Sequence, residues 1–327
     1  MDEETNSLET VSFHCRSPIF MCSTCTHAEN CQDLLNILRM FKYEAKPPEF
    51  DYMAHFPFLK ERTFEIDPRN SMNDLSSGEW LQFTRTVFSS KFPKVIGHEL
   101  RRAHPDYKSP HLFGQLISFF TRRDDLVFDP FAGTGSSLIA ASLLGRKAIA
   151  FEINSKWVDI YYRICKKHDI QRQKLVEGDC LHLIFSLPKE TLDFVVIDPP
   201  NPFNTAEWSL AAEEPKAPLD AFLKFMLRIL NQCYAALKDH KYVAIFTRNL
   251  YHNGRYLYLT PYFASIAAEA GFVFKGEKIW ENVGEKLRPY GYPHSYVPNI
   301  VHYNILFFQK SETEEKNEEA PLKPKKP

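Results

Sequence analysis

Two short stretches of this 327-residue chain combine residue types that could bind a nucleotide and activate an amine. In the first, Asp129 precedes the turn Gly133-Thr134-Gly135, and Glu152 follows it. Two glycines let the backbone approach a ligand closely, and an acid at the end of the next strand is placed to hold ribose hydroxyls. The second stretch is Asp198-Pro199-Pro200-Asn201. Because two prolines cannot extend a central strand, they form a stiff shelf at its end.

The shelf suits the activation of an exocyclic amine, which is a poor nucleophile because its lone pair is delocalised into the ring. The Asp198 carboxylate and the Pro199 carbonyl could accept the two N–H bonds of such an amine. This would favour rehybridisation at nitrogen and direct its lone pair toward an activated methyl group, so catalysis would consist of positioning and electrostatics. A structural proline turn is the alternative interpretation of these residues.

The glycine turn favours one class of nucleotide. A P-loop would require Gly-Lys-Ser/Thr, and the dinucleotide fingerprint would require a third glycine; the sequence GTGSS has neither. A close backbone approach, an acid before the turn and a ribose acid after it suit a ligand that carries an amino acid at one end. S-adenosylmethionine is such a ligand. The alternative is another Rossmann-like enzyme with a glycine-rich turn.

The elements around these residues alternate in the manner of an α/β fold. Apolar runs predict buried strands, and apolar residues at helical spacing predict helices between them. The expected strands are 126–128, 148–151, 175–176, 192–197 and 241–246, and the expected helices are 110–120, 136–144, 155–168, 217–238 and 261–270. Segments 272–280 and 301–309 are expected to form an antiparallel pair.

The stretch DPFAGTGSSLIAASLLGRKAIAFEIN, residues 129–154, resembles motifs I and II of the amino-methyltransferases that modify exocyclic nitrogens of DNA bases. Residues 198–201 resemble motif IV, and helix 110–120 resembles motif X. The resemblance implies a Rossmann-like S-adenosylmethionine-dependent methyltransferase with a mostly parallel, seven-stranded sheet ending in an antiparallel hairpin. The motif order X, I, IV looks permuted.

The resemblance also implies roles for individual residues. Direct methyl transfer would be catalysed by Asp198, Pro199, Pro200 and Asn201. The cofactor would be bound by Asp129, Phe131, Gly133, Gly135, Glu152 and Asp179. Adenine N6 is favoured over cytosine N4 because an Asp in the first position of motif IV is commoner in the adenine enzymes. The prolyl-cysteine of C5-cytosine methylases is absent from the sequence.

One residue departs from the motif. Asn201 stands where an aromatic residue normally stacks on the flipped base. Phe203 or Trp208 could supply that surface. Further contacts with nucleic acid are expected from Arg288, Tyr290 and Tyr292, in a stretch that resembles the same methylases and interleaves aromatic with basic residues. The alternative is a proline-stiffened loop that only packs. Basic residues along 85–111 predict either a phosphate-following stripe or an ordinary solvated face.

Four of the seven cysteines, Cys15, Cys22, Cys25 and Cys31, lie close together near the N-terminus. Closely spaced thiolates hold zinc or an iron–sulfur cluster. The spacing resembles the loop that binds a [4Fe–4S] cluster in DNA glycosylases of the endonuclease III kind, and the predicted helix 32–42 would cover it. A [4Fe–4S] cluster is favoured, with zinc or no metal as alternatives.

Composition sets the remaining expectations. The net charge of −1 gives no global cationic signature, so contact with nucleic acid must be local. No apolar run reaches membrane-spanning length, and a cytoplasmic protein is expected. The predicted divisions are a cysteine region (1–45), a linker and basic segment (46–110), a catalytic domain (111–310) and a disordered tail (311–327). The expected substrate is DNA, with RNA or non-catalytic nucleic-acid binding as alternatives. A cognate restriction endonuclease is a candidate partner, and the sequence does not give the oligomeric state.

Overall fold

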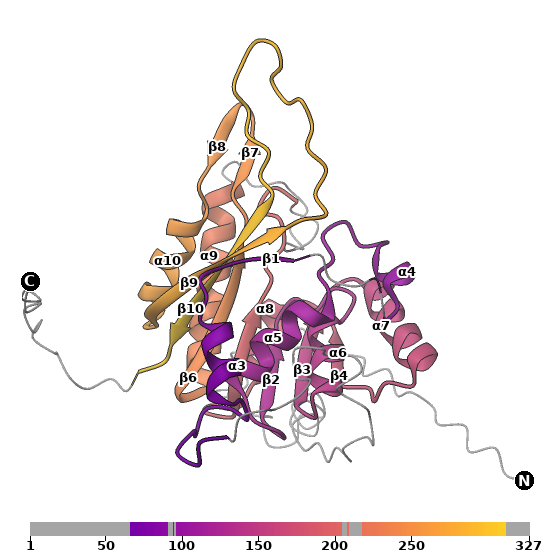
Figure 1. Ribbon diagram of the computed structural model, residues 1–327, viewed down its shortest axis with the longest axis vertical. Helices are drawn as coiled ribbons and strands as arrows, with labels where there is room; N and C mark the ends of the chain where they lie inside the picture. Colours follow the sequence, from indigo (N-terminus) through magenta and orange to yellow (C-terminus); the bar gives the residue numbers. More distant parts are fainter. Residues whose placement is uncertain (1–65, 91–93, 95, 205–207, 209–217, 312–327) are drawn as a thin grey trace, which may run out of the picture.

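The computed structural model describes residues 66–90, 94, 96–204, 208 and 218–311. They form a mixed eight-stranded sheet with helices on both faces and a small two-stranded sheet, β7 (Leu250–His252) with β8 (Arg255–Leu257) (Figure 1). The four clustered cysteines, the predicted helix 32–42 and the tail from residue 312 lie outside the described residues.

The large sheet has the strand order β1-β9-β10-β6-β5-β2-β3-β4. Strands β6, β5, β2, β3 and β4 are parallel, and β10 runs antiparallel to both β6 and β9. The predicted Rossmann-like methyltransferase fold, a mostly parallel sheet with an antiparallel pair near one edge, is therefore confirmed. The strands are β1 (Val87–Ser90), β2 (Leu126–Asp129), β3 (Lys147–Glu152), β4 (Lys174–Glu177), β5 (Leu192–Ile197), β6 (Leu237–Thr247), β9 (Val273–Asn282) and β10 (His302–Gln309).

The sequence predicted seven strands, and the structure adds an eighth at the sheet edge. Strand β1 pairs in parallel with β9, with Val87 opposite Ile279, and the Trp280 indole N–H donates to the Ser90 hydroxyl at 2.8 Å. The sequence VFSS is too short and too exposed to show a strand pattern, so only its partner strand reveals it. The segment before residue 111 thus contributes to the same sheet.

Helices cover both faces of the sheet. On one face lie α5 (Pro110–Phe120), α6 (Ser136–Leu143) and α7 (Ser155–His168), and on the other lie α8 (Cys180–Leu183), α9 (Pro218–Ala236) and α10 (Thr260–Glu269). The short helices α3 (Ser77–Phe83) and α4 (His98–Arg101) precede them. No described helix is long and apolar enough to cross a membrane.

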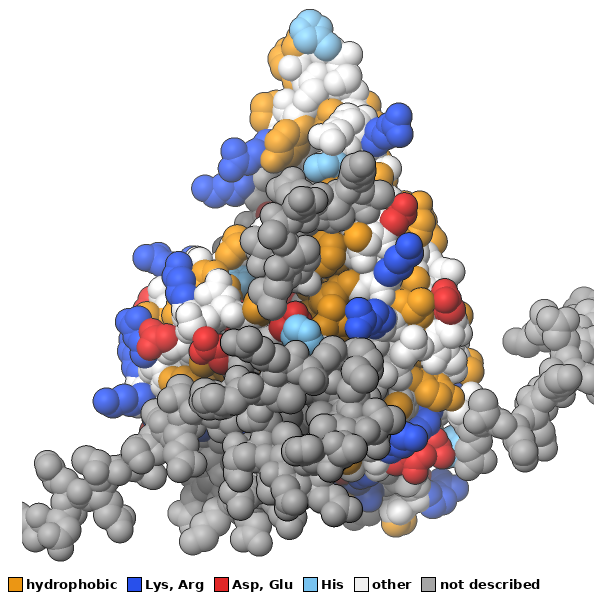
Figure 2. Space-filling view, turned by 180° about the vertical axis from the view of Figure 1, so that it is seen from behind, with side chains coloured by type: hydrophobic (Ala, Val, Ile, Leu, Met, Phe, Trp, Pro, Cys, Tyr) orange, Lys and Arg blue, Asp and Glu red, His pale blue; other side chains and the backbone are white. Residues whose placement is uncertain are grey.

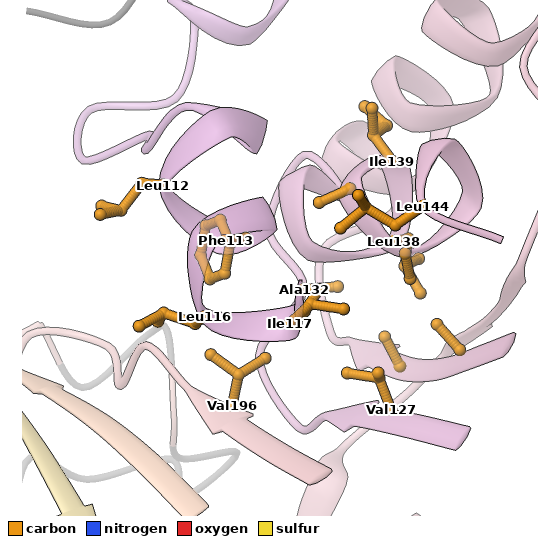
Figure 3. Packing of buried hydrophobic residues seen from close by; sticks show 14 of the residues in the cluster. Leu112, Phe113, Leu116, Ile117, Val127, Ala132, Leu138, Ile139, Leu144 and Val196 are labelled. Carbon is orange, nitrogen blue, oxygen red and sulfur yellow. The ribbon is translucent and has the colours of Figure 1, made fainter. Parts of the chain in front are cut away.

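The central strand β5 shows why the core forms on two sides. All its residues are buried, and Phe194 and Val196 join one apolar cluster while Val195 and Ile197 join the other. Strands buried on both faces are expected in a parallel sheet covered by helices. Helix α5 begins with a Ser109 cap and Pro110, and its residues Phe113 and Ile117 belong to the same cluster as Val196 (Figure 3). This packing places the start of α5 at the carboxyl edge of the sheet.

Candidate active site

Asp129 holds the glycine turn in place through two hydrogen bonds to residues on either side of the turn. One carboxylate oxygen accepts the Phe131 N–H at 2.9 Å, and the other accepts the Ser137 hydroxyl. Burial raises the pKa of Asp129 to about 7, although both hydrogen bonds oppose the shift. Because Asp129 is buried and does not line the cleft described below, its visible contacts are with the turn itself.

Glu152, at the end of β3, ties the turn to the next loop. Its Oε2 accepts the Gly133 N–H at 2.7 Å, and its Oε1 accepts the Asn154 N–H at 2.8 Å. Carboxylate oxygens can each accept more than one hydrogen bond, so these contacts are compatible with a ribose hydroxyl as a further partner. Glu152 therefore orients the turn at the place where the sequence predicted a ribose ligand.

A cleft of about 490 Å³ lies at the carboxyl edge of the sheet and brings the two predicted stretches together. This volume falls in the range of small-molecule sites. Residues from the cofactor prediction and from the shelf line the same cleft, namely Phe131, Gly133, Glu152, Asp179, Asp198, Pro199, Pro200 and Asn201. Asp129 and Gly135 lie behind this wall. Asp179 also caps α8, accepting the Leu181 N–H at 2.9 Å.

Asn201 stands where the motif has an aromatic residue, and two aromatic residues follow it in the chain. The Asn201 side chain accepts the Phe203 N–H at 2.9 Å and so closes a local turn. The Phe203 ring stacks on His252, with 3.8 Å between centroids and 8° between planes. Trp208 is buried against Phe222 and Phe225 and lines the cleft with them, whereas Phe203 does not line it. Of the two aromatics considered from sequence, Phe203 is the more exposed.

Lys108 is the principal cleft residue that sequence reasoning missed. Its Nζ donates to both oxygens of Asp198, at 2.8 and 2.7 Å, although the two residues are 90 positions apart. The Lys108 side chain is 2% exposed and that of Asp198 is 21% exposed. The sequence placed Lys108 in a basic stripe, but Lys108 and Arg101 are buried, so the stripe is not one solvated face. Lys108 comes just before the helix that starts at Ser109-Pro110, and this signal could have placed it at the carboxyl edge of the sheet.

Opposed effects set the charges of this pair. Burial raises the pKa of Asp198 to about 6, while Lys108 works against that rise. Burial alone would lower the pKa of Lys108, but Asp198 and Asp106 outweigh it and raise that pKa. Lys108 is therefore an ammonium at neutral pH, and Asp198 is mostly a carboxylate.

A second set of polar residues continues along the cleft wall. The Tyr303 hydroxyl donates to Asp106 at 2.7 Å, and Arg248 donates to the Tyr303 oxygen at 3.1 Å. Arg248 also donates to the Ile300 carbonyl at 2.8 Å. Burial alone would raise the pKa of Asp106, but Lys108, the Tyr303 hydroxyl and Arg248 together lower it. These contacts connect the cleft to the base of the β9–β10 loop.

The predicted substrate residues Arg288, Tyr290 and Tyr292 lie in the β9–β10 loop and do not line the cleft. This loop and the β7–β8 hairpin project from the same end of the molecule (Figure 1). Tyr292 is 81% exposed. Figure 2 shows Lys and Arg side chains on both flanks of this projection, with hydrophobic side chains and a histidine near its tip. The structure thus separates these residues from the cleft while leaving them open to a large partner.

No three His, Cys, Asp or Glu side chains gather to hold a metal ion within residues 66–311, as far as the structure describes them. The cysteine prediction falls outside this range.

Type II methyltransferases are among the proteins of similar sequence. The chain is 26% identical to the type II methyltransferase M.MthZI of Methanothermobacter thermautotrophicus over 34% of this chain and 33% of that protein. It is 33% identical to M.HinfI of Haemophilus influenzae over 20% of this chain and 19% of that protein. The chain therefore spans about a fifth to a third of the length of these relatives.

Among solved structures, TrmN from Thermus thermophilus is similar with a TM-score of 0.44 and 16% identity, over 65% of this chain and 53% of that one. A candidate DNA modification methylase from Thermus thermophilus, complexed with S-adenosyl-L-methionine, is similar with a TM-score of 0.32 and 21% identity, over 42% of this chain and 54% of that one. A sequence model of one family matches residues 27–163 and 192–327, which is most of the chain. The protein belongs to that family, the N6/N4 DNA methylases.

Proposed function

We propose that the protein transfers a methyl group from S-adenosylmethionine to an exocyclic amino nitrogen of a DNA base, with adenine N6 favoured over cytosine N4. The observation that carries this proposal is the single cleft in which Gly133 and Glu152 face the same space as Asp198 and Pro199. A wall suited to a nucleotide and a shelf suited to an amine thereby face the same cleft, as direct transfer requires.

The residues present fit the cofactor. Phe131 and Gly133 offer an aromatic surface and a close backbone approach, and Glu152 and Asp179 offer acceptors for ribose and adenine groups. When bound, S-adenosylmethionine supplies a methyl group on a sulfonium, whose C–S bond breaks as the N–C bond forms. Membership of the DNA methylase family supports this choice of cofactor.

The shelf residues would act on the amine. Asp198 and the Pro199 carbonyl accept its two N–H bonds, so that the nitrogen lone pair is directed toward the methyl group. Pro200 keeps the backbone rigid, and Asn201 fixes the turn that presents Phe203. Of the two candidate aromatics, Trp208 lines the cleft and would provide the surface for a flipped base, while Phe203 stacks on His252 outside the cleft lining. The methylated nitrogen then loses a proton to Asp198 or to water.

The direct test is transfer of a tritiated methyl group to DNA and to RNA, followed by nucleoside analysis of the product. N6-methyladenine or N4-methylcytosine in DNA is the expected product. Label found only in RNA would change the proposed substrate from DNA to RNA. Absence of transfer to either would support the alternative of a non-catalytic nucleic-acid-binding protein with this fold. Since two relatives are type II methyltransferases, we further propose a modification role beside a cognate restriction endonuclease.

The projecting loop is proposed to contact DNA beside the flipped base. We expect Arg288→Ala to weaken DNA binding and to reduce the slope of log K against log salt by about 1, because one phosphate contact is lost. Tyr292→Ala should raise the Kd about fivefold or more at unchanged salt slope, as a stacking contact worth about 1–3 kcal/mol would. Fluorescence anisotropy with labelled duplexes at several salt concentrations measures both.

The matched control is Arg163→Ala, which removes an exposed arginine from α7. It should leave the DNA affinity and the salt slope unchanged. If Arg288→Ala behaves like this control, and Tyr290 and Tyr292 variants also bind normally, the loop only packs. Cofactor affinity should be unaffected in every one of these variants.

Cys15, Cys22, Cys25 and Cys31 are proposed to hold a [4Fe–4S] cluster, with zinc as the alternative. The support is their spacing in the sequence alone. Anaerobically purified protein should be brown, with broad visible absorption that Cys25→Ser removes. A colourless protein containing one zinc would support the alternative.

A further inference from the structure

The Lys108 ammonium lies between two carboxylates at the cleft. It contacts Asp198 through two hydrogen bonds of 2.7 and 2.8 Å, and its Nζ is 3.5 Å from Asp106 Oδ2. It also lies over the Tyr303 ring, 4.6 Å from the centroid. A nearly fully buried cation that contacts both oxygens of the shelf carboxylate restricts the orientation of that carboxylate.

The backbone of Lys108 is fixed from two further elements. The Ser136 hydroxyl at the start of α6 donates to the Lys108 carbonyl at 2.7 Å, and the buried Arg101 of α4 donates to the same oxygen at 3.2 Å. Ser136 immediately follows the glycine turn. The ammonium is therefore held in register with both the cofactor wall and the shelf.

We propose that Lys108 is a positioning residue for methyl transfer, which holds the Asp198 carboxylate ionised and oriented so that it can accept a hydrogen bond from the target amine. This role rests on the proposed methyltransferase function. A carboxylate has about four acceptor positions, so two contacts from Lys108 leave capacity for an amine N–H. A protonated Asp198 would instead carry a donor, and its contact with the amine would weaken.

The charges around Asp198 make Lys108 the decisive group. Asp106 and Asp129 are acidic and disfavour a second negative charge nearby, and burial has the same effect. Tyr303 and Arg248 face Asp106 from β10 and from the end of β6. Among the described residues that form a hydrogen bond or ion pair with Asp198, Lys108 is the cation. Removing its charge leaves burial and the neighbouring acids to favour protonation of Asp198.

The test is the pH profile of kcat for Lys108→Met in the full-length protein. Wild type should lose activity as the pH falls through about 6, where the Asp198–Lys108 pair takes up a proton. In Lys108→Met this limb should move up by about 1–3 pH units, as expected when a carboxylate loses an adjacent cation. The rate at pH 7 should then fall by about twofold for a shift of 1 unit and by about 90-fold for a shift of 3 units, and it should recover substantially at pH 9. Recovery at alkaline pH would not occur if Lys108 were only structural.

Three further variants separate the effect of the Lys108 charge from a general structural effect. Lys108→Arg should keep the limb near its wild-type position, and Lys167→Met, which removes an exposed lysine paired with Glu99, should leave the profile unchanged. In an Asp198→Asn background there is no carboxylate to protonate, so Lys108→Met should add less than about a twofold loss. An unshifted limb, equal losses at all pH values, or the same loss in the Asp198→Asn background would overturn the role. Absence of methyl transfer by wild type would instead overturn the proposed function itself.

Discussion

Asp198→Ala is expected to lower kcat for methyl transfer by about 10²–10³-fold, the range seen when one preorganised polar contact to a reacting group is removed. The variant should retain affinity for S-adenosylmethionine within about threefold. The loss of activity in Asp198→Ala should appear in kcat, because the contact between Asp198 and the amine matters most as the nitrogen rehybridises. Single-turnover methyl transfer and calorimetric titration of the cofactor measure the two quantities separately.

The substitution also leaves Lys108 beside only one carboxylate, so the stability of the variant must be recorded. Breaking a buried ion pair costs about 3–5 kcal/mol, although Asp106 and the partial exposure of Asp198 reduce that figure here. The double variant Asp198→Ala with Lys108→Met removes both charges and should regain stability without regaining activity. Asp159→Ala, which removes an exposed acid from α7, is the control. A wild-type rate in folded Asp198→Ala would remove Asp198 from the mechanism.

Local patterns predicted seven of the eight strands of the large sheet and the two stretches that line the cleft. Helix α5 was expected at its observed bounds because Pro110 and the apolar residues up to Phe120 mark both ends. The shelf was expected because Pro199 and Pro200 end a run of buried residues. In both cases the determining residues lie within one element, so the sequence carries the signal directly.

The features that sequence reasoning missed depend on contacts between distant segments. Strand β1 exists only because β9 pairs with it, and its four residues carry no periodic pattern. The pairing of Lys108 with Asp198 needs the start of α5 and the end of β5 to meet at one edge of the sheet. Lysine on a basic segment is more often solvated than buried, so residue type alone pointed to the surface. Long-range pairing of this kind is fixed by topology rather than by local sequence.

The glycine turn illustrates the same limit, because Gly133 and Gly135 look equivalent in sequence but have different surroundings. Both have positive φ values, +51° and +76°. A Cβ on Gly133 would lie 3.5 Å from the His104 ring, which is ordinary contact, and it would face the cleft. A Cβ on Gly135 would lie 2.2 Å from the buried ring of Tyr161. Gly133 is therefore suited to ligand approach, and Gly135 to packing of α6 against α7.

We therefore expect Gly135→Ala to destabilise the protein far more than Gly133→Ala. The left-handed backbone costs about 1–2 kcal/mol at either position, and overpacking adds about 1–3 kcal/mol at Gly135 alone. The Tyr161 ring cannot easily move, because its hydroxyl accepts the Gln173 N–H at 2.7 Å. Thermal unfolding should show the larger fall in Tm for Gly135→Ala, whereas Gly133→Ala should chiefly weaken cofactor binding. In a Tyr161→Leu background the extra cost of Gly135→Ala should shrink toward that of Gly133→Ala. Equal Tm values for the two single variants would show that the turn relaxes away from Tyr161 and that packing does not explain the second glycine.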